Sequence, residues 1–207
     1  MTIRKGVDWG TTAPTPATLA LVRSDSELRE FLSDARLMGV APGPFGLLGG
    51  DLMRTVGGSG DESRLTTAQD VTHLTIDAVR VIADDMRIGW FAAHCVIRHG
   101  WWRNTLIGAF NAQFLGSWDV CPRGHPNDGK IDIITVSAAM SIRQRVMARQ
   151  RLPLGIHVPH PQIIIRQSPT TVIMLDKPMK LWLDGQTWGS AQRIEFVVEP
   201  DSFVVCV

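Results

Sequence analysis

From residue 59 onward, short apolar runs alternate with turn residues along the chain. Such spacing is typical of short strands in an antiparallel sandwich or a closed antiparallel sheet. We therefore expect a mostly β (α+β) fold, an antiparallel β-sandwich-like domain with a few helices. The expected strands are residues 73–76, 79–82, 89–97, 104–111, 130–136, 163–167, 171–175, 180–183, 195–198 and 202–207.

The N-terminal part of the chain has a different pattern. After a Thr- and Pro-rich arm, TLALV (18–22) and FGLL (45–48) are short apolar runs that predict two strands. Between them, Ser24 and Glu27 have the spacing of a capping box, and apolar residues follow at helical spacing. We expect this helix to end near Gly39.

A short helix, LMRTV (52–56), is expected to follow the second of these strands. The order strand, helix, strand, helix makes one βαβ unit, which is too little for a complete nucleotide-binding sheet. We expect residues 1–58 to form an arm and a short βαβ remnant. Residues 59–207 are expected to form the β domain.

One further helix is predicted among the strands, from Ser141 to Arg151. Its apolar positions are Ile142, Val146 and Met147, which favour an inward face. We expect the opposite, basic face to be solvated, and a contact with phosphate or an acidic partner is the alternative. That face carries Arg143, Arg145, Arg149 and Arg151.

The overall charge and the cysteines exclude several classes of protein. With 21 basic and 20 acidic residues the net charge is +1, so nothing attracts nucleic acid over long range. No apolar run reaches the ~20 residues that span a bilayer, and the N-terminus lacks the apolar core of a signal peptide. Three scattered cysteines fit neither a disulfide framework nor a zinc site, so we expect a cytoplasmic protein.

The segment FGLLGGDLMRTVGG (45–58) is the first candidate for chemistry. Glycines after a buried strand let backbone N–H groups approach an anion, which makes Gly49, Gly50 and Asp51 candidate cofactor-binding residues. The segment matches neither a P-loop nor a complete dinucleotide fingerprint. The alternative is a tight strand-to-helix turn in which Asp51 is the N-cap.

A second candidate lies around Gly129. Asn127, Asp128 and Asp132 offer carboxylate and amide oxygens, which suit a hard cation such as Mg²⁺ or Ca²⁺. Asn-Asp-Gly is also an ordinary turn sequence, so a turn without metal is the alternative.

The third candidate is Asp184, which precedes Gly185 between two alternating apolar runs. Asp-Gly in this setting is a strong hairpin signal. The alternative role for Asp184 is that of a carboxylate at a strand end, able to accept a proton from a hydroxyl nucleophile.

Read in order, these segments resemble the diacylglycerol kinase, sphingosine kinase and bacterial lipid kinase family. The resemblance covers roughly residues 45–207, the acceptor-side (C-terminal) part of that family. Gly49, Gly50 and Asp51 stand where the family has Gly-Thr and Asn-Asp. Leu183-Asp184-Gly185-Gln186 stands where a strand ends in Asp-Gly-Glu. An Asn-x-x-x-x-Gly-Gly segment, a Pro and an Asp-Asp-Gly-x-x-Asp loop correspond to Asn111, Gly116, Pro122, Asn127-Asp128-Gly129 and Asp132.

The resemblance implies roles for these residues. Asp184 would be the base that activates a lipid hydroxyl, and Asp128 and Asp132 would hold a structural magnesium ion. The sequence departs from the family in lacking its Gly-Gly-Asp-Gly-Thr nucleotide motif, and Gln186 replaces the glutamate of Asp-Gly-Glu. The resemblance thus predicts an acceptor-side domain without a full ATP-binding domain.

Three functions follow as hypotheses. The first is binding of a lipid or other hydroxyl-bearing amphiphile, with no complete ATP site in this chain. The second is an ATP-dependent lipid phosphotransferase that uses Mg²⁺ and is completed by oligomerisation or by a separate nucleotide-binding chain. The third is an interaction protein that forms a homodimer through exposed sheet edges. Co-purifying lipid, Mg-ATP-dependent stabilisation and oligomeric mass discriminate among them.

Overall fold

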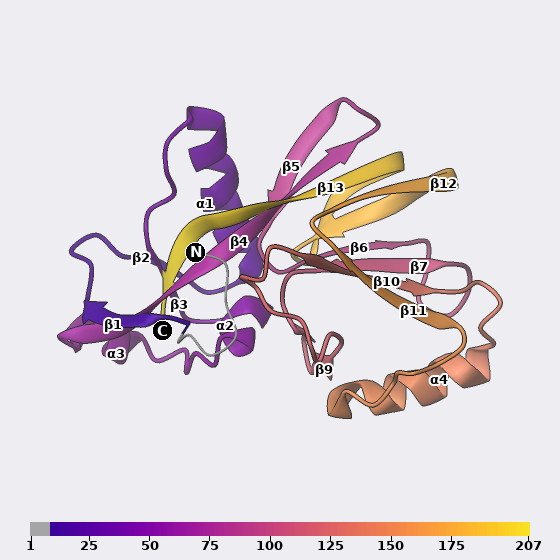
Figure 1. Ribbon diagram of the computed structural model, residues 1–207, viewed down its shortest axis with the longest axis horizontal. Helices are drawn as coiled ribbons and strands as arrows, with labels where there is room; N and C mark the ends of the chain where they lie inside the picture. Colours follow the sequence, from indigo (N-terminus) through magenta and orange to yellow (C-terminus); the bar gives the residue numbers. More distant parts are fainter. Residues whose placement is uncertain (1–8) are drawn as a thin grey trace.

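The computed structural model describes residues 9–207, and the start of the N-terminal arm lies outside these residues. It confirms a mostly antiparallel β fold with few helices (Figure 1). The strands are β1 (Thr11–Pro14), β2 (Ala20–Val22), β3 (Phe45–Leu47), β4 (Asp70–Ala83), β5 (Arg87–Phe91), β6 (His94–Arg98), β7 (Leu106–Phe110), β8 (Phe114–Leu115), β9 (Trp118–Asp119), β10 (Ile131–Val136), β11 (Ile163–Ser168), β12 (Thr170–Leu183) and β13 (Gln186–Cys206). The helices are α1 (Asp25–Met38), α2 (Asp51–Thr55), α3 (Glu62–Thr67), α4 (Ile142–Arg151) and a 3-10 turn at Leu152–Leu154.

Eleven strands form one continuous sheet, and β8 and β9 form a separate hairpin. The main strand order is β1-β4-β13-β12-β6-β7-β10-β11. The long strands β4 and β13 pair along most of their length and run from the end that holds α1 to the end that holds β12 (Figure 1). This pair makes the sheet continuous from one end of the molecule to the other.

Three expected pairs of short strands are each one long strand. Strand β4 unites residues 73–76 with 79–82, β12 unites 171–175 with 180–183, and β13 unites 195–198 with 202–207. Register shifts interrupt the pairing in β12 and β13, and the strands continue through them. Local polar residues therefore mark bulges here and not the ends of strands.

The expected strand 89–97 is divided into β5 and β6. The backbone N–H groups of Ala92 and Ala93 donate to the carboxylate of Asp184 in place of a neighbouring strand. A side chain far away in the sequence thus ends one strand and begins the next.

The N-terminal unit has the predicted order β2, α1, β3, α2, and β2 and β3 are parallel. Ser24 caps α1 by accepting from the N–H of Glu27, and Gly39 ends the helix in the left-handed conformation. The carboxylate of Glu27 accepts from the N–H of Arg23, so the reciprocal bond of a capping box is shifted by one residue. Strand β3 also pairs with β13, which joins the N-terminal unit to the main sheet.

Residues 9–207 contain four apolar clusters, and the two largest form most of the core. One lies among the main-sheet strands, and its largest side chains include Phe91, Phe196, Leu181 and Ile194. The other lies between the sheet and α1 and α2, where Leu28, Leu32, Leu52, Ile76 and Phe203 meet. No helix among residues 9–207 is long and apolar enough to cross a bilayer.

Helix α4 presents the opposite face from the one predicted. Ile142, Val146 and Met147 are 46%, 38% and 44% exposed, whereas Arg145 is only 6% exposed. The Arg145 guanidinium donates to four backbone carbonyls, which belong to Trp101, Asn104, Ser137 and Met140. These carbonyls lie in loops where no strand supplies a donor, so the planar, multi-donor arginine decides the orientation of the helix.

We expect Arg145→Met to lower the free energy of unfolding by about 2–4 kcal/mol, because four carbonyls lose their donor while the apolar stem is kept. Urea denaturation of the purified variant measures this change. Arg143→Met, on the exposed part of the same helix, is the matched control and should shift stability by less than about 0.5 kcal/mol. Equal effects of the two substitutions would contradict the role assigned to Arg145.

Candidate functional site

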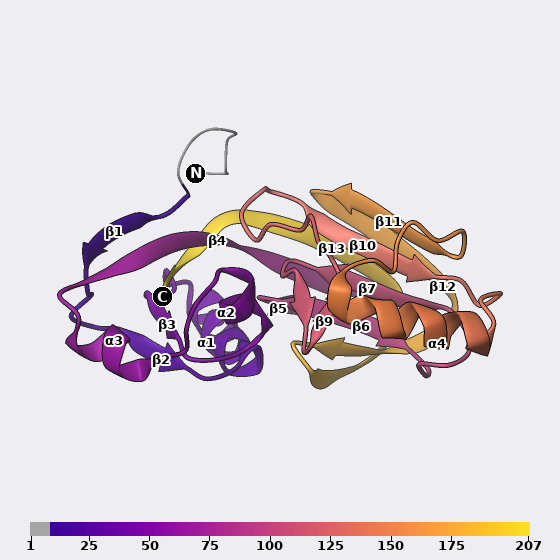
Figure 2. The same cartoon turned by 90° about the horizontal axis from the view of Figure 1, so that it is seen from below.

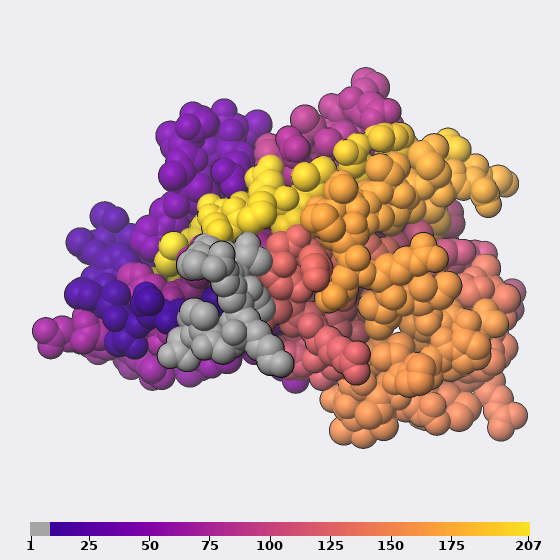
Figure 3. Space-filling view, in the orientation of Figure 1, coloured from indigo at the N-terminus to yellow at the C-terminus, as the bar shows by residue number. Residues whose placement is uncertain are grey.

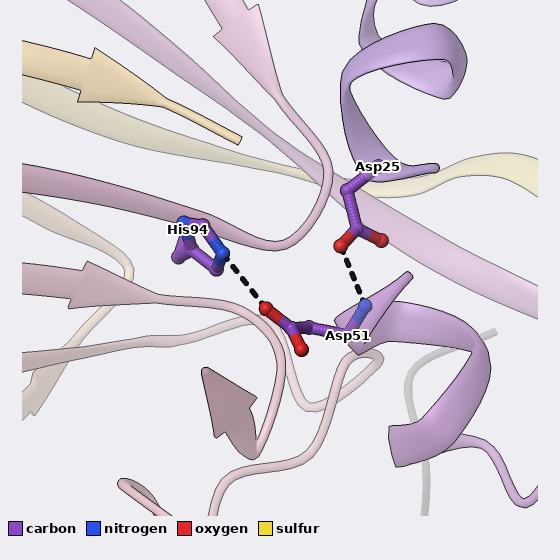
Figure 4. A group of neighbouring side chains, drawn as sticks. All are labelled: Asp25, Asp51 and His94. Atoms are coloured by element: carbon purple, nitrogen blue, oxygen red, sulfur yellow. Dashed lines mark hydrogen bonds and ion pairs between the residues drawn. The ribbon is translucent and has the colours of Figure 1, made fainter. Parts of the chain in front are cut away.

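Asp25, Asp51 and His94 meet at the junction of the N-terminal unit and the main sheet (Figure 4). His94, at the start of β6, lies with Nε2 3.0 Å from Oδ2 of Asp51. The Asp25 carboxylate accepts from the backbone N–H groups of Asp51 and Leu52 at 2.6 and 3.0 Å. One ligand atom from each of the three side chains lies within 4.8 Å of the other two.

The Asp184 side chain adds a third carboxylate to this group, bonded to the backbone N–H of His94. The Leu183–Gln186 pairing confirms a hairpin with Asp184 and Gly185 as its two turn residues. Asp184 has a φ of 46° and points its carboxylate inward. The oxygens accept from the backbone N–H groups of Ala92, Ala93 and His94 at 2.9, 3.0 and 2.9 Å.

Asp184 therefore holds the β12–β13 hairpin to the chain between β5 and β6. Its carboxylate is buried, and its proposed role as the base stays a prediction. Gln186, the other residue expected in catalysis, lies away from this carboxylate network and accepts from Nη2 of Arg29 at 2.7 Å. That contact links the hairpin to α1.

Burial shifts the pKa values of Asp25, His94 and Asp184. Burial, together with the negative charge of Asp184, raises the pKa of Asp25 from 3.8 to about 7. Burial also raises the pKa of Asp184, although His94 and the three backbone donors oppose the shift. For His94, burial lowers the pKa, but the carboxylates of Asp51, Asp184 and Asp25 outweigh it and raise the value above normal. The group thus favours a positively charged His94 among acids.

The glycine turn Gly49–Gly50 is closely packed by the chain itself. A Cβ on Gly49 would lie 2.4 Å from the carbonyl oxygen of Arg23, and a Cβ on Gly50 would lie 2.5 Å from Oδ1 of Asp25. Gly50, and not Asp51, is the N-cap of α2. The N–H groups that start this helix donate to the Asp25 carboxylate, and cofactor binding at Gly49, Gly50 and Asp51 stays a prediction.

The expected cation loop is organised by Asp77, a residue that the sequence did not single out. Its buried carboxylate accepts from the backbone N–H groups of Gly129 and Asp201 at 2.8 and 2.9 Å and from Nδ2 of Asn127 at 3.3 Å. Asp128 accepts from the N–H of Lys130. These hydrogen bonds order the turn, and a magnesium ion at Asp128 and Asp132 stays a prediction.

Asp128 and Asp132 nevertheless fit Mg²⁺ in the kind of donor that they offer. Burial raises the pKa of Asp132 to about 6, and the charge of Asp128 raises it as well. Mg²⁺ is commonly bound by one or two carboxylates together with water. Among the described residues, Asp25, Asp51 and His94 form the one group of three or more His, Cys, Asp or Glu side chains close enough to share a cation. The Asp25 and Asp51 carboxylates and Nε2 of His94 are already hydrogen-bonded within the group or to the backbone, whereas the buried Nδ1 of His94 has no hydrogen-bond partner.

An apolar cavity of about 290 Å³ lies between α4 and the strands β6, β7 and β10. Arg145 and His157 are the buried polar side chains in its wall. Most of the lining is aromatic or aliphatic: Val96, Trp101, Trp102, Leu106, Phe110, Leu115, Trp118, Val120, Ile134, Val136, Met140, Leu152 and Ile163.

A second cavity of about 440 Å³ adjoins the first and shares five lining residues with it. These are Val96, Trp101, Leu115, Trp118 and Arg149. The second cavity is lined also by His94 and by Gly185, the neighbour of Asp184. The apolar space under α4 therefore adjoins a cavity that reaches His94 and the β12–β13 turn.

Two residues of this site escaped sequence reasoning in different ways. Asp25 lies between Ser24 and Glu27 in the capping segment, where an acidic residue in the first helical turn is ordinary, so nothing local predicts that it is only 7% exposed. His94 was visible within an apolar run, but nothing local predicted its pairing with Asp51, which is 43 positions away. Long-range contacts of this kind leave no periodic signal.

No protein-family model matches the sequence, and no curated protein matches it. Solved structures do resemble its fold. A protein described as a "putative diacylglycerol kinase" from Bacillus anthracis strain Sterne aligns with a TM-score of 0.68 and 12% identity, over 90% of this chain and 77% of its own. A diacylglycerol kinase structure from the same strain gives 0.65 and 14%, over 90% and 75%. At these identities the likeness establishes a lipid-kinase-like fold.

The raised pKa of Asp25 generates a prediction about pH. Between about pH 4 and 7 the folded state holds a proton on Asp25 that the unfolded chain has lost, so the Asp25 contribution to stability falls as the pH rises through this window. In Asp25→Asn this contribution is absent. The stability of the variant relative to the wild type should therefore increase from about pH 5 to about pH 8.

Urea unfolding at the two pH values measures this difference. Asp34→Asn, on the exposed face of the same helix, is the control and should show the same offset at both. An offset for Asp25→Asn that does not change with pH would show that the carboxyl titrates normally.

A magnesium titration tests the pair Asp128 and Asp132. Mg²⁺ at a hundredfold excess over its Kd should stabilise the folded protein by about 2.7 kcal/mol, because it binds the folded state alone. Asp132→Asn should lose this Mg²⁺-dependent increment, whereas Asp176→Asn, an exposed position, should keep it. Thermal denaturation with and without Mg²⁺ provides the measurement, and an equal increment in all three proteins would place the ion elsewhere.

Proposed function

We propose that this lipid-kinase-like protein binds a lipid or another hydroxyl-bearing amphiphile. The carrying observation is the pair of adjoining cavities, one apolar under α4 and one reaching His94 and Gly185. A concave, mainly apolar site with few polar groups is the usual form of a small-molecule site. In this arrangement the tail of the amphiphile lies under α4 and its head lies toward the β12–β13 hairpin.

The fold gives independent support. The solved structures that share it are described as diacylglycerol kinases, and a diacylglycerol is an amphiphile with a free hydroxyl group. In our proposal Asp184 and His94 stand at the head-group end of the site. Whether Asp184 takes a proton from the hydroxyl group is the catalytic part of the proposal, which the binding part does not require.

We propose further that the chain has no ATP site of its own. The support comes from the glycine turn, where the Asp25 carboxylate already accepts from the N–H groups of Asp51 and Leu52. A nucleotide phosphate would have to displace a buried carboxylate from these donors. A phosphotransferase would then need a separate nucleotide-binding chain or a second copy of this one.

We place this function in the cytoplasm. Cys95, Cys121 and Cys206 are free and buried. Free thiols of this kind are compatible with a reducing compartment.

A cavity-filling variant tests the proposed function. Ala148 lines the apolar cavity from α4, so Ala148→Phe should occupy the space of the tail. We expect delipidated wild-type protein to bind a monoacylglycerol and Ala148→Phe to bind it at least about tenfold more weakly, since lost burial of a few methylenes is worth that much. Gln150→Phe, on the exposed side of the helix, is the matched control and should bind like the wild type.

Tryptophan fluorescence reports the titration, because Trp101, Trp102, Trp118 and Trp182 line the two cavities. Native mass spectrometry of the freshly purified protein should also show a co-purifying amphiphile. Mg-ATP should leave the melting temperature unchanged. Wild-type protein that binds no monoacylglycerol, or an Ala148→Phe variant that binds it normally, would refute the proposal.

A further inference from the structure

The side chains that line the second cavity include basic groups and no acidic group. Three of its lining side chains, His94, Arg98 and Arg149, are cationic or able to become so, and none is acidic. The carboxylates of Asp51 and Asp184, which both contact His94, are engaged with His94 or with backbone N–H groups. The wall that a ligand would contact is therefore positive.

Arg98 is the central cation of this wall. Its guanidinium lies over the ring of Trp182 at 4.1 Å and over the ring of Trp101 at 4.3 Å. Its Nε is buried and has no hydrogen-bond acceptor. Within residues 9–207, its side chain forms no ion pair with an acid, and burial lowers its pKa. Half-buried guanidinium groups are normally paired with a carboxylate or another anion. Arg98 is stacked on two tryptophan rings and has no such anion, so an anionic ligand would supply the missing partner.

Arg149 brings a second cation from α4 and lines both cavities. It lies over the rings of Trp102 and Trp118 at 5.4 and 5.5 Å, so the aromatic rings hold it beside the cavities and not in an ion pair. The two arginines come from a strand and a helix on different walls. They can thus approach a single anion from two directions.

The surrounding segment adds to this positive potential. Residues 133–175 contain no Asp and no Glu, although the whole chain is almost neutral. This segment includes α4 and β11 and forms the orange surface at the lower right of the space-filling view (Figure 3). Its five basic residues are Arg143, Arg145, Arg149, Arg151 and Arg166. Figure 2 shows α4 along the same end of the molecule as β6 and β7.

We propose that the two cavities together take a single-chain anionic lipid, with its carboxylate or phosphate between Arg98 and Arg149 and its acyl chain under α4. This inference rests on the proposed amphiphile-binding function and names the head group. An apolar tail space that opens onto two unpaired guanidinium groups favours an anionic head over a neutral or cationic one. Guanidinium groups bind carboxylates and phosphates through the same forked geometry, so both head groups fit.

Ligands that share one acyl chain test the head group separately from the tail. Lauric acid, lauryl phosphate and lauryl alcohol are titrated into the delipidated protein below their micelle concentrations, with tryptophan fluorescence and calorimetry as readouts. We expect the two anions to bind at least about tenfold more tightly than the alcohol, as charge-assisted hydrogen bonds imply. Inorganic phosphate alone should bind far more weakly than lauryl phosphate, because it leaves the apolar cavity unfilled.

Three variants assign the effect to Arg98. In Arg98→Gln the tighter binding of the anions should disappear, while binding of lauryl alcohol changes less than about twofold. Arg98→Lys keeps the charge and should retain part of the preference. Arg143→Gln removes the same charge from the exposed side of α4 and should behave like the wild type. Circular dichroism and melting temperatures establish that each variant is folded.

The outcomes separate this inference from the function on which it rests. Equal affinity for the three lipids, or an equal loss for all of them in Arg98→Gln, would overturn the anionic head group and leave amphiphile binding intact. Binding of inorganic phosphate as tight as that of lauryl phosphate would show an anion site without a lipid. A protein that binds none of the three lipids would overturn both proposals.

Discussion

The carboxylate of Asp184 accepts three backbone N–H groups from the chain between β5 and β6, and the arrangement of the site depends on this contact. It fixes the β12–β13 hairpin against the middle of the sheet. It also holds the backbone N–H of His94, the first residue of β6. The His94 imidazole in turn contacts the Asp51 carboxylate. Asp51 is the first residue of α2, and its backbone N–H donates to the Asp25 carboxylate. Elements from the two ends of the chain are thereby joined by a series of charged and polar contacts.

These contacts are buried, so their balance of charge matters. Three carboxyl groups surround one imidazole, and burial raises the pKa of Asp25 and Asp184 because water no longer stabilises their ionised forms. A proton on Asp25 and a positive charge on His94 both reduce the excess negative charge. The same network reaches the glycine turn after β3, where the Asp25 carboxylate accepts from the backbone N–H groups of Asp51 and Leu52.

The apolar cavity depends on a different buried charge. Arg145 holds α4 by donating to four loop carbonyls, and this turns the arginine inward and leaves Ile142, Val146 and Met147 at the surface. The helix therefore covers the strands β6, β7 and β10 and leaves the apolar cavity between itself and these strands. A satisfied guanidinium at Arg145, in the wall of the first cavity, and an unsatisfied one at Arg98, in the wall of the second, have different consequences: the first stabilises the position of α4, and the second is the basis of the proposed anionic ligand.

The sequence by itself determined the local elements. Ser24 and Gly39 mark the ends of α1, the Asp184–Gly185 turn makes a hairpin, and most strands lie where apolar runs predicted them, because caps, turns and strand periodicity act over a few residues. The short strands β1, β8 and β9 were not predicted. The sequence also suggested a resemblance whose fold the solved structures share. Tertiary structure alone decided which short strands are continuous, which face of α4 is buried, and that Asp25, Asp51, His94 and Asp184 meet. Those outcomes depend on hydrogen bonds between residues that are far apart in the chain. The strength of such a bond depends on how deeply it is buried, and the local sequence pattern does not reveal that burial.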